Sequence, residues 1–204
     1  MANEPRAHEP RAHQLRAHGS AAYELAQVNI GRLAAPLDSP ALAGFMAALD
    51  PLNAAAEAAP GFVWRLQTED GNATAIQAFG WDTAGSAGVI VNMSVWAGVE
   101  QLASYVYGDL HRQIMRRRRE WFQLMREAYT TCWWVPAGHR PSTADAEERI
   151  RYLRAHGPTP HAFTLRASFR RPPPASRPAQ IIHPAAPSPS RAVTTGCARL
   201  SLGR

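Results

Sequence analysis

The residues best suited to chemistry are concentrated in one stretch of the chain, from Val89 to Phe122. It contains Asn92, Trp96, Tyr107 and His111. The His111 imidazole can gain or lose a proton near neutral pH, and the Asn92 amide can hold a ligand by hydrogen bonds. The same residues have an ordinary structural interpretation as a hydrogen-bonded sheet residue, a core tryptophan and a half-buried helix histidine. Both interpretations stay open at this point.

This stretch is predicted to be a strand that runs into a long helix. From Val89 to Trp96 one face is wholly apolar, and the other carries polar residues that include Asn92. From Val99 to about Phe122, apolar residues recur at helical spacing, and His111 lies at the edge of their stripe. Tyr107 lies one turn earlier on the same side. The strand and the helix would therefore hold the candidate residues near one another.

The remaining elements complete a split β-α-β-β-α-β pattern, which is typical of the ferredoxin-like plan with a mostly antiparallel sheet. The connection between the second and third strands ends in Trp81–Gly88, a segment rich in Gly and Ala that we expect to be a flexible loop. The predicted fold class is thus α+β, with both main helices on one face of the sheet. The other predicted elements are strands at Tyr23–Ile30, Phe62–Gln67, Tyr129–Val135 and His161–Arg166, a helix that begins at Ser39-Pro40, and a short helix at Thr143–His156.

The second face of the predicted sheet also needs cover. Aromatic and aliphatic residues occupy both sides of Phe62–Gln67 and Tyr129–Val135. Because a single chain of this pattern has no third layer to offer, we expect a second copy to pack sheet to sheet as a two-fold homodimer.

Charge and composition exclude several classes of partner. The 204-residue chain has 22 Lys+Arg against 16 Asp+Glu, all of the basic residues are Arg, and the excess lies in the two end segments. Nucleic acid is therefore not an expected partner of the central region. No apolar run is long enough to cross a membrane, and no secretory signal precedes the first strand, so we expect a cytoplasmic protein. The predicted organisation is a disordered Arg-Ala-His repeat at 1–20, a folded domain at 21–166 and a disordered Pro-, Ser- and Arg-rich tail at 167–204.

Several segments of the central region resemble a known family, the uncharacterised domain-of-unknown-function family 3291. This family is grouped with the dimeric α/β barrels similar to antibiotic-biosynthesis monooxygenases, and the resemblance implies that fold. It implies no established activity. The matching segments are Pro60–Gln67, Gly71–Phe79, Val89–Trp96, His111–Phe122, Trp133–Pro141 and Arg154–Arg166.

The resemblance also implies where a site would lie, because such barrels hold ligands between the helices and the sheet. Relatives in the wider superfamily oxidise aromatic molecules without a cofactor or degrade haem. By this likeness His111 would be a general base or an axial haem ligand, Asn29 or Asn92 would orient an oxyanion or dioxygen, and Trp96 would form an apolar wall. The function expected is a monooxygenase-like enzyme acting on a small hydrophobic or aromatic substrate, without a cofactor or with haem. The alternative is a non-catalytic dimeric ligand-binding or stress-related module. The further candidate substrate-binding residues are Asn29, Arg65 and Tyr107.

Overall fold

The computed structural model describes residues 22–174, which form an α+β unit around one four-stranded antiparallel sheet. The expected repeat segment at 1–20 lies outside the described residues, and so does the expected tail from residue 175 onward. Within residues 22–174, no helix is both long and apolar enough to cross a membrane.

The sheet has the strand order β2-β3-β1-β4. Its strands are β1 (Tyr23–Arg32), β2 (Phe62–Arg65), β3 (Val89–Trp96) and β4 (Thr130–Pro136). The two long strands β1 and β3 lie in the middle and pair from Leu25 opposite Trp96 to Arg32 opposite Val89. Alternate residues of these strands are apolar and many are β-branched, which is typical of an antiparallel sheet with one face packed on a core.

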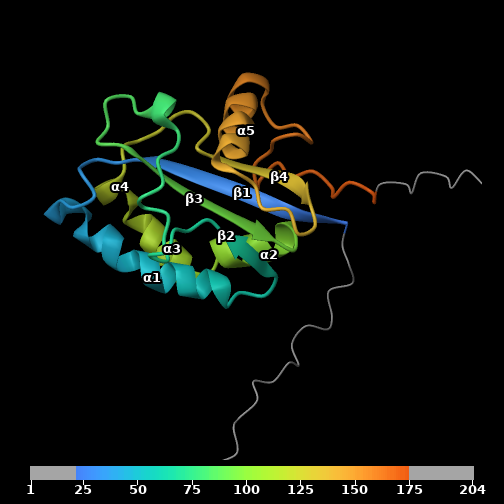
Figure 1. The fold of residues 1–204 in the computed structure, drawn as a ribbon, viewed down its shortest axis with the longest axis horizontal. Helices are drawn as coiled ribbons and strands as arrows, with labels where there is room; N and C mark the ends of the chain where they lie inside the picture. Colours follow the sequence, from blue (N-terminus) through green and yellow to red (C-terminus); the bar gives the residue numbers. More distant parts are fainter. Residues whose placement is uncertain (1–21, 175–204) are drawn as a thin grey trace, which may run out of the picture. The chain divides into compact units, whose positions relative to one another are not determined.

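Within residues 22–174, five α-helices cover the two faces of this sheet. They are α1 (Ala43–Glu57), α2 (Val99–Val106), α3 (Asp109–Arg116), α4 (Arg118–Trp121) and α5 (Thr143–His156). Two 3-10 segments, η1 (Pro40–Leu42) and η2 (Gly80–Asp82), precede α1 and β3. Helices α1, α2 and α3 lie along one side of the sheet, and α5 lies on the other (Figure 1). We call the first side the helix-facing side.

The predicted long helix from Val99 to Phe122 is wrong, because the chain breaks it twice into α2, α3 and α4. After α2 ends, Gly108 has extended backbone angles (φ −65°, ψ 155°), and this conformation interrupts the helical hydrogen bonds. A second break follows at Arg117. Glycine is a poor helix residue, so the break at Gly108 agrees with its propensity. As a result α3 is a separate, two-turn helix with breaks at both ends.

The expectation that one chain has no cover for the second face of the sheet is also wrong. Helix α5 packs against β4, and Ile150 is fully buried there. Phe79, from the connection before β3, is also fully buried in the same cluster. Beneath them, Met93 and Val95 of β3 are 1% and 0% exposed. The apolar face that was expected to require a second copy is therefore buried within the chain.

The connection that was expected to be a flexible loop is anchored by a buried ion-pair network. Asp82, which is 4% exposed, accepts hydrogen bonds from Arg32 at 2.6 Å and from Arg154 at 2.9 and 3.0 Å. Beside it, the indole of Trp81 and the backbone NH of Phe79 both donate to the Glu147 carboxylate of α5. These contacts fix Gly80–Asp82 between the end of β1 and α5.

The expected last strand at His161–Arg166 is wrong, since only Phe163 forms a bridge to the sheet. Its NH and carbonyl pair with Cys132 of β4 at 2.9 and 2.7 Å. The Thr131 hydroxyl also donates to the Phe163 carbonyl. Farther along, the Phe169 ring packs on Phe163, and the Phe169 carbonyl accepts from the Trp134 indole. The segment after α5 therefore covers the outer edge of β4 without becoming a fifth strand.

Candidate functional site

Strand register arranges the helix-facing side of the sheet as a series of rows. At one end Phe62, Trp96, Leu25 and Trp134 lie across the four strands. The next two rows contain polar residues on three or more strands. We call these two rows the polar rows. The first consists of Arg65, Ser94, Gln27 and Cys132, and the second consists of Asn92, Asn29 and Thr130.

Hydrogen bonds connect part of the polar rows to the tryptophan at their end. The Gln27 side-chain amide donates to the Ser94 hydroxyl oxygen at 2.9 Å and makes a longer contact of 3.4 Å to the side-chain oxygen Oδ1 of Asn92. The Trp96 indole donates to the same Ser94 oxygen at 2.8 Å. Among residues 22–174, the Asn29 side chain makes no hydrogen bond to another protein group, and the Asn92 NH2 group donates none. These amides therefore retain free hydrogen-bonding capacity.

Two apolar clusters border the polar rows. The first joins Leu25 and Trp96 of the sheet to Leu102 of α2, and the second includes Phe45 of α1 and Trp121 of α4. Between them the Asn92 side chain is exposed, although β3 is an inner strand of the sheet. Solvent thus reaches a polar strip that lies between two apolar clusters.

Helix α3 lies over this side of the sheet but buries none of its own residues. Its Ile114 packs partly against the second apolar cluster, and His111 contacts Tyr105 of α2 at 5.2 Å between ring centroids. Leu110 is 41% exposed, although the sequence places it on the apolar stripe. Few apolar contacts hold α3 in place, which is typical of segments that open at low free energy.

An aromatic series links the predicted residues Trp96 and His111 through Tyr105. The Tyr105 ring stacks on Trp96 with centroids 5.2 Å apart, and the His111 ring meets Tyr105 edge-on. Burial lowers the pKa of His111, and a hydrogen bond with the Val106 backbone opposes this only in part. His111 is therefore neutral at pH 7. Burial also raises the pKa of Tyr105 to about 12, so that its hydroxyl stays protonated.

The two other predicted binding residues are placed differently. Arg65 lies in the polar rows, but its guanidinium donates to the Glu57 carboxylate of α1 at 2.7 Å. Tyr107 follows α2 and is 53% exposed. The structure thus brings Asn29, Asn92 and Trp96 onto one side of the sheet and connects His111 to Trp96 through Tyr105.

Three residues of this site were missed as candidates in the sequence. Gln27 and Ser94 are joined to Asn92 and Trp96 by hydrogen bonds, and the alternation of β1 and β3 would have placed both on the same side. Tyr105 gave no such signal, because its role depends on the break that separates α2 from α3.

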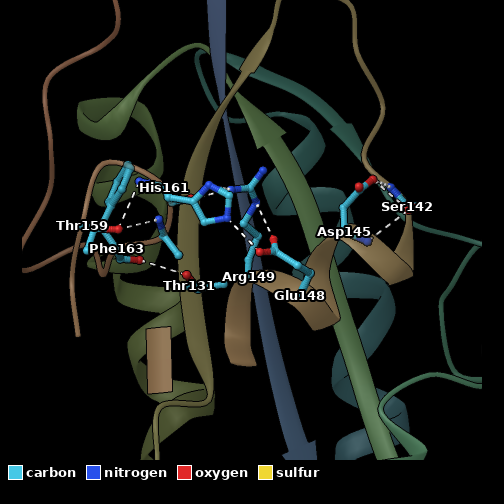
Figure 2. A network of polar contacts seen from close by, with 9 residues as sticks. Thr131, Ser142, Asp145, Glu148, Arg149, Thr159, His161 and Phe163 are labelled. Carbon is cyan, nitrogen blue, oxygen red and sulfur yellow. Dashed lines mark hydrogen bonds and ion pairs between the residues drawn. The ribbon is translucent and has the colours of Figure 1, made fainter. Parts of the chain in front are cut away.

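A second polar cluster lies on α5, away from the polar rows. Figure 2 shows His161 held between Arg149 and Glu148. His161 Nε2 is 2.8 Å from a Glu148 carboxylate oxygen, and the Arg149 guanidinium contacts both His161 Nδ1 and the His161 carbonyl. These contacts fasten the chain after α5, which carries Phe163 to the edge of β4. The cluster therefore has a positioning role.

Hollows on the surface of residues 22–174 include two that do not involve the polar rows. One of about 440 Å³ lies on the outer side of α5 beside Tyr152 and His156. The other, of about 510 Å³, lies beside Trp134 and Arg171 at the start of α2. In residues 22–174, no three His, Cys, Asp or Glu side chains are grouped so that they could hold a metal ion.

Comparison with known proteins identifies the family. A crystal structure of a protein of unknown function from Nitrosomonas europaea matches with 16% sequence identity and a TM-score of 0.35, covering 59% of this chain and 97% of that one. No curated protein matches the chain significantly. The family described as domain of unknown function DUF3291 matches residues 24–179. Because this match extends over most of the chain, the protein belongs to the DUF3291 family.

Proposed function

We propose that this protein binds a small organic molecule between the polar rows and helix α3. The observation that carries the proposal is the exposed Asn92 amide on an inner strand, between two apolar clusters. A ligand there would contact partly exposed side chains at the margins of these clusters, such as Phe62 and Ile114, and hydrogen-bond to Asn92 between them. This combination of apolar lining and a few polar groups is what fixes the orientation of small ligands.

The loose packing of α3 supports the same location. A ligand that enters between α3 and the sheet must displace water and move few side chains, since α3 buries none of its residues. Apolar side chains that are now partly exposed, such as Leu110, would then gain contacts. Ligand binding would therefore stabilise the protein by favouring a more closely packed α3.

The strand order also supports the finer description of the fold. The order β2-β3-β1-β4, with helices after β1 and β3, agrees with a ferredoxin-like unit and with the superfamily of antibiotic-biosynthesis-monooxygenase-like barrels. In a dimeric barrel of this kind, the face beneath α5 would have to meet a partner. Because α5 already covers that face and the polar rows lie on the opposite one, the proposed site does not depend on a homodimer.

Ligand-observed and protein-observed NMR can test the proposal. A library of small aromatic amides is screened against the 15N-labelled protein, and the side-chain NH2 signals of Asn29 and Asn92 are followed. We expect these signals to shift with the hits, and Asn92→Leu to abolish binding while the protein stays folded. Gln67→Leu is the matched control, because it removes an exposed amide outside the polar rows. Hits that bind equally well to the Asn92→Leu protein would refute the location.

A second candidate function is favoured by the His111 environment. A histidine that is neutral at pH 7 can accept a proton, and His111 lies next to the aromatic pair Tyr105 and Trp96. In a cofactor-free oxygenase, His111 would remove a proton from an aromatic substrate, and the resulting carbanion would react with dioxygen. Asn92 would hydrogen-bond to the developing oxyanion.

The haem variant of this chemistry does not fit the arrangement. Trp96 is fully buried against Phe62 and Tyr105, and the His111 ring packs against Tyr105. A macrocycle ligated by His111 and walled by Trp96 would have to displace Tyr105 from between them. We therefore include no haem in the proposal.

Oxygen uptake with anthrone tests the cofactor-free reaction. Anthrone has an acidic CH2 group and takes up one O2 to give anthraquinone and water. If His111 is the base, uptake above the buffer rate should fall by a factor of about 100 or more in His111→Gln, within the range that general-base catalysis contributes. Uptake that is equal in both proteins, or equal to buffer alone, would reject the oxygenase and leave the binding function.

A further inference from the structure

The helix-facing side of the sheet is almost free of charge. Among the strand residues that register places on this side, Arg65 is the one charged residue. The other two charged residues of the strands, Glu24 and Arg32, alternate onto the opposite face. The polar rows otherwise present amides, hydroxyls and the Cys132 thiol. Burial raises the pKa of that thiol to about 12, so it is neutral at pH 7.

The single charge in the polar rows is already neutralised. The Arg65 side chain is 12% exposed, and its Nε donates to a Glu57 carboxylate oxygen at 2.7 Å. On α3, Arg112 donates to Asp109 at 2.6 Å, and both side chains are exposed. The remaining charged residue of α3, Arg116, is exposed in its last turn. A charged ligand would therefore find no free counter-charge in the polar rows.

We infer that the ligand of the proposed site is an uncharged molecule with an aromatic or apolar body and an amide- or alcohol-type group that both donates and accepts hydrogen bonds. The inference rests on the proposed function and specifies its ligand class. Asn29 and Asn92 each offer an NH2 donor and a carbonyl acceptor, so they can match a neutral amide in both directions. The partly exposed side chains of Phe62, Tyr105 and Ile114 offer adjoining apolar surface, and so does Leu110 of α3, which is 41% exposed.

The physical reason is the unequal penalty for removing charged and neutral groups from water. A neutral amide that leaves water for the polar rows recovers its hydrogen bonds from the asparagines. A carboxylate or an ammonium also loses its ionic hydration, which amide dipoles replace incompletely. The carboxylate could pair with Arg65 only by displacing Glu57, which would then lose its own partner. The site thus discriminates against either sign of charge.

Three compounds with one aromatic body test this inference. At pH 7.5 indole-3-acetamide is neutral, indole-3-acetate is negatively charged and tryptamine is positively charged. Their dissociation constants are measured by isothermal titration calorimetry and by shifts of the asparagine side-chain signals. We expect the amide to bind at least tenfold more tightly than either ion, and Asn92→Leu to remove this binding.

A second variant tests the neutralisation of Arg65 directly. Glu57→Gln keeps the size of the side chain at a half-exposed position and frees the Arg65 charge. In this variant the affinity for indole-3-acetate should rise about tenfold, as a hydrogen bond between charged groups allows, while the affinity for the amide stays unchanged. Glu100→Gln on α2 is the matched control, because Glu100 is exposed and is not paired with Arg65.

The outcomes separate this inference from the proposed function. If the carboxylate or the amine binds as tightly as the amide and Asn92→Leu removes the binding, the site stands and the uncharged class is wrong. If Glu57→Gln leaves indole-3-acetate binding unchanged, the role of the Arg65–Glu57 pair is wrong. If none of the three compounds binds at millimolar concentration, both the ligand class and the proposed function are overturned.

Discussion

Asp82 offers the sharpest test of how this fold is held together. Substitution with asparagine keeps the shape of the side chain but removes its negative charge. Arg32 and Arg154, whose side chains are 10% and 17% exposed, would then face each other across a neutral amide. The Asn NH2 group could also point a donor at one of the two guanidinium groups. The variant would thus contain two nearly buried cations without a full counter-charge.

The magnitude follows from the contacts that the carboxylate makes. Asp82 accepts charge-assisted hydrogen bonds of 2.6 Å from Arg32, and of 2.9 and 3.0 Å from Arg154. Removing one partner of a buried ion pair destabilises proteins by about 3–5 kcal/mol, largely because the other charge stays buried. Arg154 is the less buried of the two arginines, and water can reach it in part. We therefore expect the free energy of unfolding to fall by about 3 kcal/mol, the lower end of this range.

Urea unfolding at pH 7, followed by tryptophan fluorescence, measures this loss. The matched control is Asp109→Asn, since Asp109 also pairs with an arginine at 2.6 Å but its side chain is 84% exposed. An exposed pair contributes at most about 1 kcal/mol, so the control should remain near the wild-type midpoint. Equal losses of less than about 1 kcal/mol in both variants would show that the Asp82 network does not hold the connection in place.

Two further predictions concern acid stability and a close contact. Burial by itself raises the pKa of Asp82, but hydrogen bonds and charges from the two arginines outweigh it, so that its pKa lies below the ordinary 3.8. The stabilisation by Asp82 is then complete above about pH 4 and is lost as the pH falls through the lowered pKa. The urea midpoints measured from pH 5 to pH 2 should therefore fall more steeply for wild type than for Asp82→Asn. A methyl group at Gly31 would lie 2.8 Å from the Phe122 ring, so Gly31→Ala should lower the free energy of unfolding by about 1–3 kcal/mol. Gly80→Ala, where a methyl group meets nothing within 4 Å, should change it by less than about 0.5 kcal/mol, and similar values for the two alanine variants would contradict this packing.

The elements with strong local signals could be predicted from the sequence. Strand β3 has the predicted bounds, because its alternating apolar residues are followed directly by Ala97-Gly98. Helix α5 also has the predicted bounds. Ser142 and Asp145 form a capping box at its start, and Gly157 follows its end with a φ of 72°. In both elements the residues that set the ends are neighbours in the sequence.

The features that could not be predicted depend on residues far apart in the chain. Arg32 and Arg154 are separated from Asp82 by 50 and 72 residues, and only the fold brings the three together. The glycine-rich segment around Asp82 looked like an unattached loop for this reason. The cover that α5 gives to the second face was missed in the same way, because the short helix was treated as an addition to the pattern.

Part of the candidate site could be predicted from the sequence. Alternation along β3 placed Asn92 and Trp96 on one face, and the structure has them on the helix-facing side. The positions of His111 and Tyr107 were predicted from a continuous helix, and the break at Gly108 changes them. Tyr107 is consequently exposed, while Tyr105, which was not a candidate, lies between His111 and Trp96.

The bridge between Phe163 and Cys132 has a consequence for how copies of this protein behave at high concentration. A bare outer strand invites strand addition by another molecule, which is the first step of edge-to-edge aggregation. On β4 the main-chain groups of Cys132 are already bonded to Phe163. At the opposite margin β2 has only four residues and a register irregularity between Phe62 and Trp64, which makes it a poor template. Both margins of the sheet thus discourage its growth from one molecule to the next.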